Sequence, residues 1–169
     1  MRSGVNIRRV AVLCHWIHQT VHAHFEVNQR SGDTKQGGLL NSLQMEGCPT
    51  DLQPQFILLL SQAQGTSMVT ENVYDGRFGV VEQLRMMGAD IDLEGHHAIV
   101  RGPRQLVGAE VVSTDLRAGA TLVIAGLVAE GTTIVTEPRH IDRGYADFAA
   151  RLRSLGGDVD RLAARAIAV

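Results

Sequence analysis

The sequence lacks most of the features that assign a function from composition. Its two cysteines, Cys14 and Cys48, are too few and too far apart to predict a disulfide framework. No apolar run is long enough to span a bilayer, and a net charge of −2 gives no strong field toward nucleic acid or a membrane. A glycine-rich phosphate loop, a standard zinc motif and a Ser-His-Asp set are also absent. With 44% hydrophobic and 20% charged residues, we expect a globular cytoplasmic protein.

What the sequence does contain is a long internal repeat. The phrase Thr-Asp-Leu at residues 50–52 returns at residues 114–116, and each copy closes on a glycine, Gly88 or Gly156. The offset is 64 residues at the two aspartates (115 minus 51) and 68 at the two glycines (156 minus 88). Solenoid repeats have periods of about 20–50 residues, so the pattern predicts a duplicated α/β unit. The copies are expected to share architecture and to differ in chemistry.

Apolar segments and turn residues predict alternating helices and strands, which is the α/β class. In the first unit we expect helices over 51–63 and 77–87, strands over 66–71, 89–93 and 97–101, and a loop over 72–76. In the second unit we expect helices over 115–129 and 144–155, strands over 110–113, 132–136, 157–162 and 164–169, and a loop over 137–143. The first helix of each unit is apolar on nearly every side and should be buried, with its sheet wrapped around it.

Individual residues mark the ends of these elements. Thr50 and Thr114 precede the first helices and are predicted N-cap residues. Residues 94–97 (Glu-Gly-His-His) predict a hairpin turn between two short strands. Four glycines are predicted to follow helix C-termini: Gly65, Gly88, Gly131 and Gly156.

The first 45 residues follow neither copy of the repeat. Residues 10–25 give a poor helical pattern, and residues 30–47 are rich in Gly, Ser, Asn and Gln, which is typical of a linker. We place a domain boundary near residue 45, followed by one domain with units of 46–105 and 106–169. His15, His18 and His22 would share one helix face, but no fourth ligand at a standard spacing accompanies them, so we predict no metal site.

Several phrases within residues 46–162 resemble the enolpyruvyl transferase family, in that family's order and with near-family spacing. They are Gly-Cys-Pro-Thr-Asp-Leu-Gln at 47–53, Thr-Glu-Asn-Val-Tyr at 70–74, Gly-Arg-Phe at 76–78, Thr-Asp-Leu-Arg-Ala at 114–118, Ala-Gly-Leu-Val-Ala-Glu-Gly at 125–131 and His-Ile-Asp-Arg-Gly-Tyr at 140–145. Together they are specific, although each alone would be weak. The resemblance implies an inside-out, barrel-like α/β domain built of similar units, of which this chain would hold two and so be incomplete.

The resemblance also implies a reaction. An enolpyruvyl group would pass from phosphoenolpyruvate to the 3′-hydroxyl of UDP-N-acetylglucosamine, with release of phosphate, during bacterial peptidoglycan synthesis. No cofactor, nucleic acid or membrane partner is implied. Because the resemblance covers only the C-terminal part of the family, a separately encoded first domain is a candidate partner, and the isolated chain is expected to be inactive. The alternative is a non-catalytic binding or complementation module derived from such an enzyme.

Two aspartates are the catalytic candidates. Addition of a hydroxyl to an enol ether carbon needs a base within hydrogen-bond reach, and the resemblance implies that Asp51 binds the sugar 3′-hydroxyl and accepts its proton. The alternative is a helix-start acid stabilised by the helix dipole, by less than about 1 kcal/mol. The resemblance places Asp115 near the reacting carbons. The helix-start alternative is stronger for Asp115, because the repeat itself demands a helix start there.

Two arginines lie in the corresponding loops of the repeats. A guanidinium binds carboxylate or phosphate through two parallel hydrogen bonds, and phosphoenolpyruvate offers both groups. The resemblance implies that Arg143 contacts phosphoenolpyruvate and that Arg77 lies near the same site. The alternative is a surface ion pair with a sequence neighbour, Asp142 or Asp75, which would contribute little.

Two further residues complete the predicted substrate-binding set. Arg117 follows Asp115 by two positions and is predicted either to set the charge state of that carboxyl or to serve structure. Val73 is expected, on the resemblance alone, to give a main-chain contact to the sugar nucleotide. From its own chemistry Val73 would only be an apolar residue at a strand end.

Overall fold

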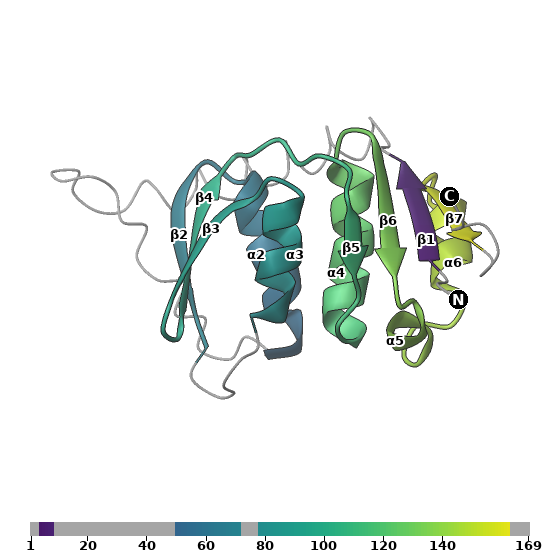
Figure 1. Cartoon of the computed structure of the whole chain (residues 1–169), viewed down its shortest axis with the longest axis horizontal. Helices are drawn as coiled ribbons and strands as arrows, with labels where there is room; N and C mark the ends of the chain where they lie inside the picture. Colours follow the sequence, from purple (N-terminus) through teal and green to yellow (C-terminus); the bar gives the residue numbers. More distant parts are fainter. Residues whose placement is uncertain (1–3, 9–49, 72–77, 163–169) are drawn as a thin grey trace, which may run out of the picture.

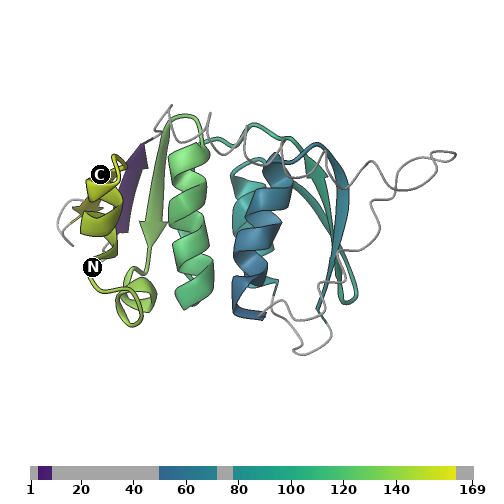
Figure 2. The same cartoon turned by 180° about the vertical axis from the view of Figure 1, so that it is seen from behind.

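The computed structural model describes residues 4–8, 50–71 and 78–162. Within them two sheets enclose a layer of helices. Figure 1 shows one sheet on the left, helices α2, α3 and α4 in the middle, and the second sheet on the right. The view from behind in Figure 2 keeps the same three layers. Helices α2, α3 and α4 therefore lie between the sheets, as the apolar first helices of the two units predicted.

The first unit contains a short 3₁₀ turn, two helices and an antiparallel sheet. In chain order these are η1 (Thr50–Leu52), α2 (Gln53–Gln62), β2 (Gly65–Thr70), α3 (Gly79–Met86), β3 (Asp90–Glu94) and β4 (His97–Gly102). The sheet order is β2-β4-β3, with both pairings antiparallel. A two-residue connection, Gly95-His96, joins β3 to β4, and its glycine has a φ of 58°. This confirms the predicted hairpin.

The second unit repeats the pattern and adds a strand from the N-terminus. Its elements are β5 (Glu110–Val112), α4 (Leu116–Val128), β6 (Thr132–Thr136), α5 (Arg139–Asp142), α6 (Phe148–Ser154) and β7 (Asp158–Leu162). The sheet order is β5-β6-β1-β7, where β1 (Gly4–Arg8) runs antiparallel to both neighbours. Strand β1 thus holds the place between β6 and β7 that β4 holds between β2 and β3.

The core forms where the helices meet the sheets. Ile57 of α2, Leu84 of α3 and Leu122 of α4 are fully buried, each contributing about 1.5–3 kcal/mol through the hydrophobic effect. Ile7 of β1 is also fully buried, against Gly126 of α4. A Cβ atom on Gly126 would lie 3.0 Å from Ile7 Cδ1, so the helix approaches the sheet closely at this point. Strand β1 is therefore an integral part of the core.

Most predicted elements are present, and the differences lie at their ends. The segment 137–143 was expected to be a loop, but it contains the helical turn α5. The predicted threonine caps are wrong: Leu52 holds the N-cap position of α2, and Asp115 holds that of α4. Only Asp115 caps its helix with a side chain, and each helix begins later than expected.

The four predicted glycines divide into two groups, although all have positive φ angles of 88–105°. Gly88 and Gly156 directly follow the C-caps of α3 and α6, as predicted. Gly65 and Gly131 stand two residues beyond the C-caps of α2 and α4, at the turns into β2 and β6. These two glycines reverse the chain instead of ending a helix.

The remaining expectations for the N-terminal region and for the last strand fall largely outside the described residues. The helix expected over 10–25, the linker over 30–47 and the strand over 164–169 cannot be compared. The domain boundary near residue 45 stays a prediction, although β1 joins the sheet of the second unit. In the described part of the chain, no helix has the length and apolar character needed to cross a membrane.

Candidate functional site

Asp115 builds the start of helix α4. Its backbone is extended, with φ −152° and ψ 175°, and its Oδ1 accepts hydrogen bonds from the backbone N–H groups of Arg117 at 2.8 Å and Ala118 at 3.0 Å. These bonds satisfy two of the N–H groups that the first turn of a helix leaves free. The structure thus gives Asp115 the helix-start role, and its catalytic role stays a prediction.

Arg117 connects the two predicted catalytic carboxylates. Its Nη1 donates to Asp51 Oδ1 at 2.7 Å, and its Nε lies 3.5 Å from Asp115 Oδ1. The hydrogen bond with Asp51 is the main cause that raises the pKa of the Arg117 guanidinium, against the opposing effect of burial. Arg117 therefore stays cationic and ties the first turn of one repeat to that of the other.

Arg143 belongs to a loop that contacts the first turn of α4. It directly follows α5, and the next residue, Gly144, packs against Leu116 in the first turn of α4. A Cβ atom on Gly144 would lie 2.6 Å from Leu116 Cδ2, so a larger residue there would require the Leu116 side chain to shift. Arg143 is exposed and forms no ion pair within the part of the chain that the structure describes. Its sequence neighbour Asp142 pairs instead with Arg161.

Val73 and Arg77 lie outside the described residues, but the residues that flank their segment are placed. Before it, the buried side chain of Glu71 accepts a 3.1 Å hydrogen bond from Gln53 Nε2, at the start of α2. After it, Gly79 begins α3, and a Cβ atom there would lie 3.6 Å from Thr114 Oγ1. Both flanks therefore lie at the end of the molecule where α2 and α4 begin.

Three helix N-termini thus meet at one end of the molecule, the lower end in Figure 1. Leu52 and Phe78, at the N-cap positions of α2 and α3, provide no side-chain cap. The aligned dipoles of the helices make such an end favourable for anions. With Arg117 and Arg143 at the same end, the arrangement suits a ligand that carries phosphate or carboxylate groups.

The sequence did not predict one buried pair at this end of the molecule. Gln53 and Glu71 form a buried pair across 18 positions of the chain, and both are part of the phrases that carry the family resemblance. Their types alone predict exposed polar residues.

No group of three or more His, Cys, Asp or Glu residues able to hold a metal occurs among residues 4–8, 50–71 and 78–162. The cluster of histidines at 15–22 lies outside those ranges.

Comparison with known proteins shows the family to which the chain belongs. The profile of the EPSP synthase (3-phosphoshikimate 1-carboxyvinyltransferase) family matches residues 12–152, so the chain belongs to this family of enolpyruvyl transferases. The match begins well before residue 46, where the first recognisable family phrase occurs. The match does not test the domain boundary predicted near residue 45.

Within the family, the chain is similar to the UDP-N-acetylglucosamine 1-carboxyvinyltransferases. It is 55% identical to UDP-N-acetylglucosamine 1-carboxyvinyltransferase 1 of Halalkalibacterium halodurans over 116 residues, which are 69% of this chain and 26% of that protein. It is 54% identical to the enzyme of Nocardia farcinica over 122 residues, 72% of this chain and 29% of that protein. The chain therefore spans less than a third of the length of these relatives.

Solved structures support the same fold. The enolpyruvyl transferase NikO from Streptomyces tendae superposes with a TM-score of 0.65 at 33% identity, over 69% of this chain and 27% of NikO. EPSP synthase from Acinetobacter baumannii gives a TM-score of 0.57 at 18% identity, over 65% of this chain and 28% of that one, which shows the fold alone. The chain thus has a mixed α/β enolpyruvyl transferase fold that is partial relative to complete structures.

Proposed function

We propose that this chain supplies the sugar-nucleotide surface of a UDP-N-acetylglucosamine 1-carboxyvinyltransferase. The reaction transfers enolpyruvyl from phosphoenolpyruvate to the 3′-hydroxyl of UDP-N-acetylglucosamine, in the bacterial cytoplasm and for peptidoglycan synthesis. The observation that carries the proposal is the Arg117–Asp51 pair at the end where three helices begin, with the loop that carries Arg143 packed against the first turn of α4. This arrangement offers one carboxylate for a hydroxyl and several cationic groups for anions.

Asp51 is the proposed general base for the 3′-hydroxyl. As the 3′-hydroxyl oxygen bonds to C2 of phosphoenolpyruvate, the C2–C3 double bond opens and C3 takes up a proton, while a carboxylate within hydrogen-bond reach accepts the hydroxyl proton. In the later step C3 gives up a proton, the C2–C3 double bond forms again, and the bond from C2 to the phosphate oxygen breaks as phosphate leaves. Asp51 is 73% exposed, and Arg117 holds one of its oxygens, so the carboxylate is directed yet open to a substrate. Asp115, occupied as the cap of α4, is the weaker candidate.

Arg143 and Arg117 have the chemistry for the anionic groups. A free guanidinium at Arg143 can hold the carboxylate or phosphate of phosphoenolpyruvate through paired hydrogen bonds. Arg117 adds positive charge between the two aspartates. Val73 and Arg77 complete the proposed substrate-binding set, at the segment between Glu71 and Phe78.

Turnover is proposed to need more protein than this chain. The two units described correspond to an incomplete barrel-like domain, and the chain matches 26–29% of its relatives' length. Catalysis of this kind requires closure of two domains around the substrates to exclude water. The isolated chain should therefore bind ligands weakly and turn nothing over, and a separately encoded first domain is the proposed partner.

A non-catalytic module is the second candidate, and the short coverage of the relatives favours it. Such a module would keep the sugar-nucleotide surface and associate with another chain without completing an enzyme. The two candidates differ in what a supplied first domain does: it restores turnover only under the first.

The test is a two-dimensional amide NMR titration of the full chain with UDP-N-acetylglucosamine, followed by phosphoenolpyruvate. We expect dispersed signals, with shifts concentrated at residues 50–53 and 115–118. A parallel assay measures phosphate release after addition of the first domain of a relative. Dispersed signals that fail to move at any concentration would contradict the proposed function, and binding without restored turnover would favour the module.

A further inference from the structure

We propose that Arg161 is a positioning residue for Arg143. It binds Asp142, the residue before Arg143, and thereby fixes α5 against the second sheet and keeps the Asp142 carboxylate neutralised. The inference rests on the proposed function in one respect, namely that Arg143 binds an anion. We call the Asp142–Arg161 pair the clamp.

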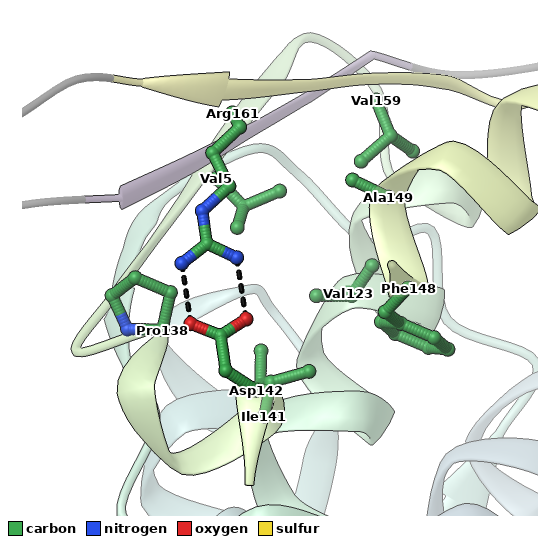
Figure 3. A pocket seen from close by; sticks show the side chains of 9 residues that line it. All are labelled: Val5, Val123, Pro138, Ile141, Asp142, Phe148, Ala149, Val159 and Arg161. Atoms are coloured by element: carbon green, nitrogen blue, oxygen red, sulfur yellow. Dashed lines mark hydrogen bonds and ion pairs between the residues drawn. The ribbon is translucent and has the colours of Figure 1, made fainter. Parts of the chain in front are cut away.

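The clamp has bidentate geometry. Nη1 and Nη2 of Arg161, on β7, donate to Oδ1 and Oδ2 of Asp142, at the end of α5. Figure 3 shows the guanidinium and the carboxylate facing each other among the residues that line a small pocket. The pocket lining is otherwise uncharged, and it includes the apolar side chains of Val5, Val123 and Phe148. Paired parallel bonds of this kind fix direction as well as distance.

The clamp also connects Arg143 to the N-terminal strand. Among the described strands, β7 pairs with β1 alone, and Val5 of β1 lies opposite Arg161. Strand β1 in turn pairs with β6, which precedes α5 in the chain. The order β6-β1-β7 therefore brings Arg161 over the segment that carries Arg143, although the two residues are 18 positions apart.

Charge gives the clamp a second effect. Asp142 is the carboxylate nearest to Arg143 in sequence, and a free carboxylate there would lower the positive potential at Arg143. With Arg161 in place, Asp142 is neutralised by a different cation, and Arg143 has no ion pair in the described part of the chain. At a separation of a few ångströms in a solvated site, one charge changes anion affinity about three- to tenfold.

The first measurement needs no ligand. Amide hydrogen exchange of residues 139–144 is compared in the full chain and in Arg161→Ala, Arg161→Ala with Asp142→Asn, and Arg101→Ala. Arg101 is the matched control, because it is an arginine of similar exposure that pairs with Asp90 and Asp92 on the other sheet. We expect exchange at 139–144 to rise about tenfold in both Arg161 variants and to stay unchanged in the control.

The second measurement is an NMR titration of the same four proteins with phosphoenolpyruvate. Arg161→Ala should weaken binding about tenfold, and adding Asp142→Asn should recover part of the loss, because the competing carboxylate is gone. A merely structural role of Arg161 would not give this recovery, since the clamp is broken in both variants.

The outcomes separate the clamp from the proposed function. If the unsubstituted chain shows no binding of phosphoenolpyruvate, the proposed function fails, and the exchange data alone decide whether Arg161 fixes α5. Equal exchange in Arg161→Ala and Arg101→Ala would overturn the inference. So would binding by the double variant that is no stronger than binding by Arg161→Ala.

Discussion

Arg117, in the first turn of α4, reaches across to Asp51 of the other repeat and bonds it at 2.7 Å. The equivalent residue of the first repeat, Gln53, instead bonds Glu71 within its own unit. Gln53 thus makes a contact within the first unit, whereas Arg117, at the equivalent position of the second unit, links the two units. The repeats share their architecture, and this single position shows where their chemistry diverges.

Replacing Asp51 should affect binding more than stability. Asp51→Asn removes the charge that would receive the sugar hydroxyl, and we expect affinity for UDP-N-acetylglucosamine to fall about five- to tenfold. The pair is exposed, so the free energy of unfolding should change by less than about 1 kcal/mol. NMR titration and urea unfolding measure the two quantities. Asp92→Asn, which removes a carboxylate that pairs with Arg101 at 2.7 Å, is the control and should leave affinity unchanged.

Two substitutions of Asp115 distinguish its cap from a catalytic role. Asp115→Ala removes both bonds to the first turn of α4 and should cost about 0.5–2 kcal/mol of stability, whereas Asp115→Asn retains an N-cap oxygen and should cost little. Urea unfolding checks both values. A loss of turnover in Asp115→Asn, with stability kept and a first domain supplied, would argue for catalysis.

Two glycine substitutions should have opposite effects on stability. A Cβ atom on Gly119 would lie 2.2 Å from Ser113 Oγ and 2.6 Å from Ile141 Cγ1, so Gly119→Ala should destabilise by about 1–3 kcal/mol. At Gly79 the nearest atom to a Cβ would be 3.6 Å away. Gly79→Ala should therefore be neutral or stabilise by up to about 1 kcal/mol. Thermal unfolding of both variants tests the packing of α5 on α4.

Lowering the pH should weaken the contribution of Asp142 to the stability of the folded protein. Hydrogen bonds from Arg161 hold the pKa of this carboxyl below its ordinary value, against the effect of burial. A depressed pKa in the folded state stabilises the protein above the unfolded pKa of about 3.9, and this stabilisation is lost as pH falls through the folded pKa. We expect the melting temperatures of the unsubstituted chain and of Asp142→Asn to differ at pH 6 and to converge at low pH. Parallel curves would contradict this linkage.

Strand β1 should be essential for stability. Ile7 is fully buried against α4, and Ile7→Ala should cost about 2–5 kcal/mol. Val112→Ala is the control, because Val112 of β5 is 44% exposed and should cost far less. Equal effects of the two substitutions on urea unfolding would mean that residues 4–8 do not form the central strand of the second sheet.

The sequence by itself determined the local structure and the family. Apolar segments separated by glycines gave the helices and strands of both units, and the two copies of Thr-Asp-Leu marked their starts. The hairpin at Gly95 followed from turn chemistry, which acts over a few residues. These features depend on neighbours in the chain, and a sequence displays such neighbours directly.

The tertiary structure decided the pairings between distant segments. Strand β1 lies between β6 and β7, more than 120 positions away in the chain, and no local pattern indicates that placement. A surface ion pair of Asp142 with its neighbour Arg143 was the alternative to a ligand-binding role for Arg143, but adjacent helical residues point in different directions and Asp142 faces Arg161 instead. Arg117 likewise makes its shortest ion pair with Asp51, 66 positions away, and a longer contact with its near neighbour Asp115. Which groups meet depends on how sheets and helices pack, and packing is a property of the whole fold.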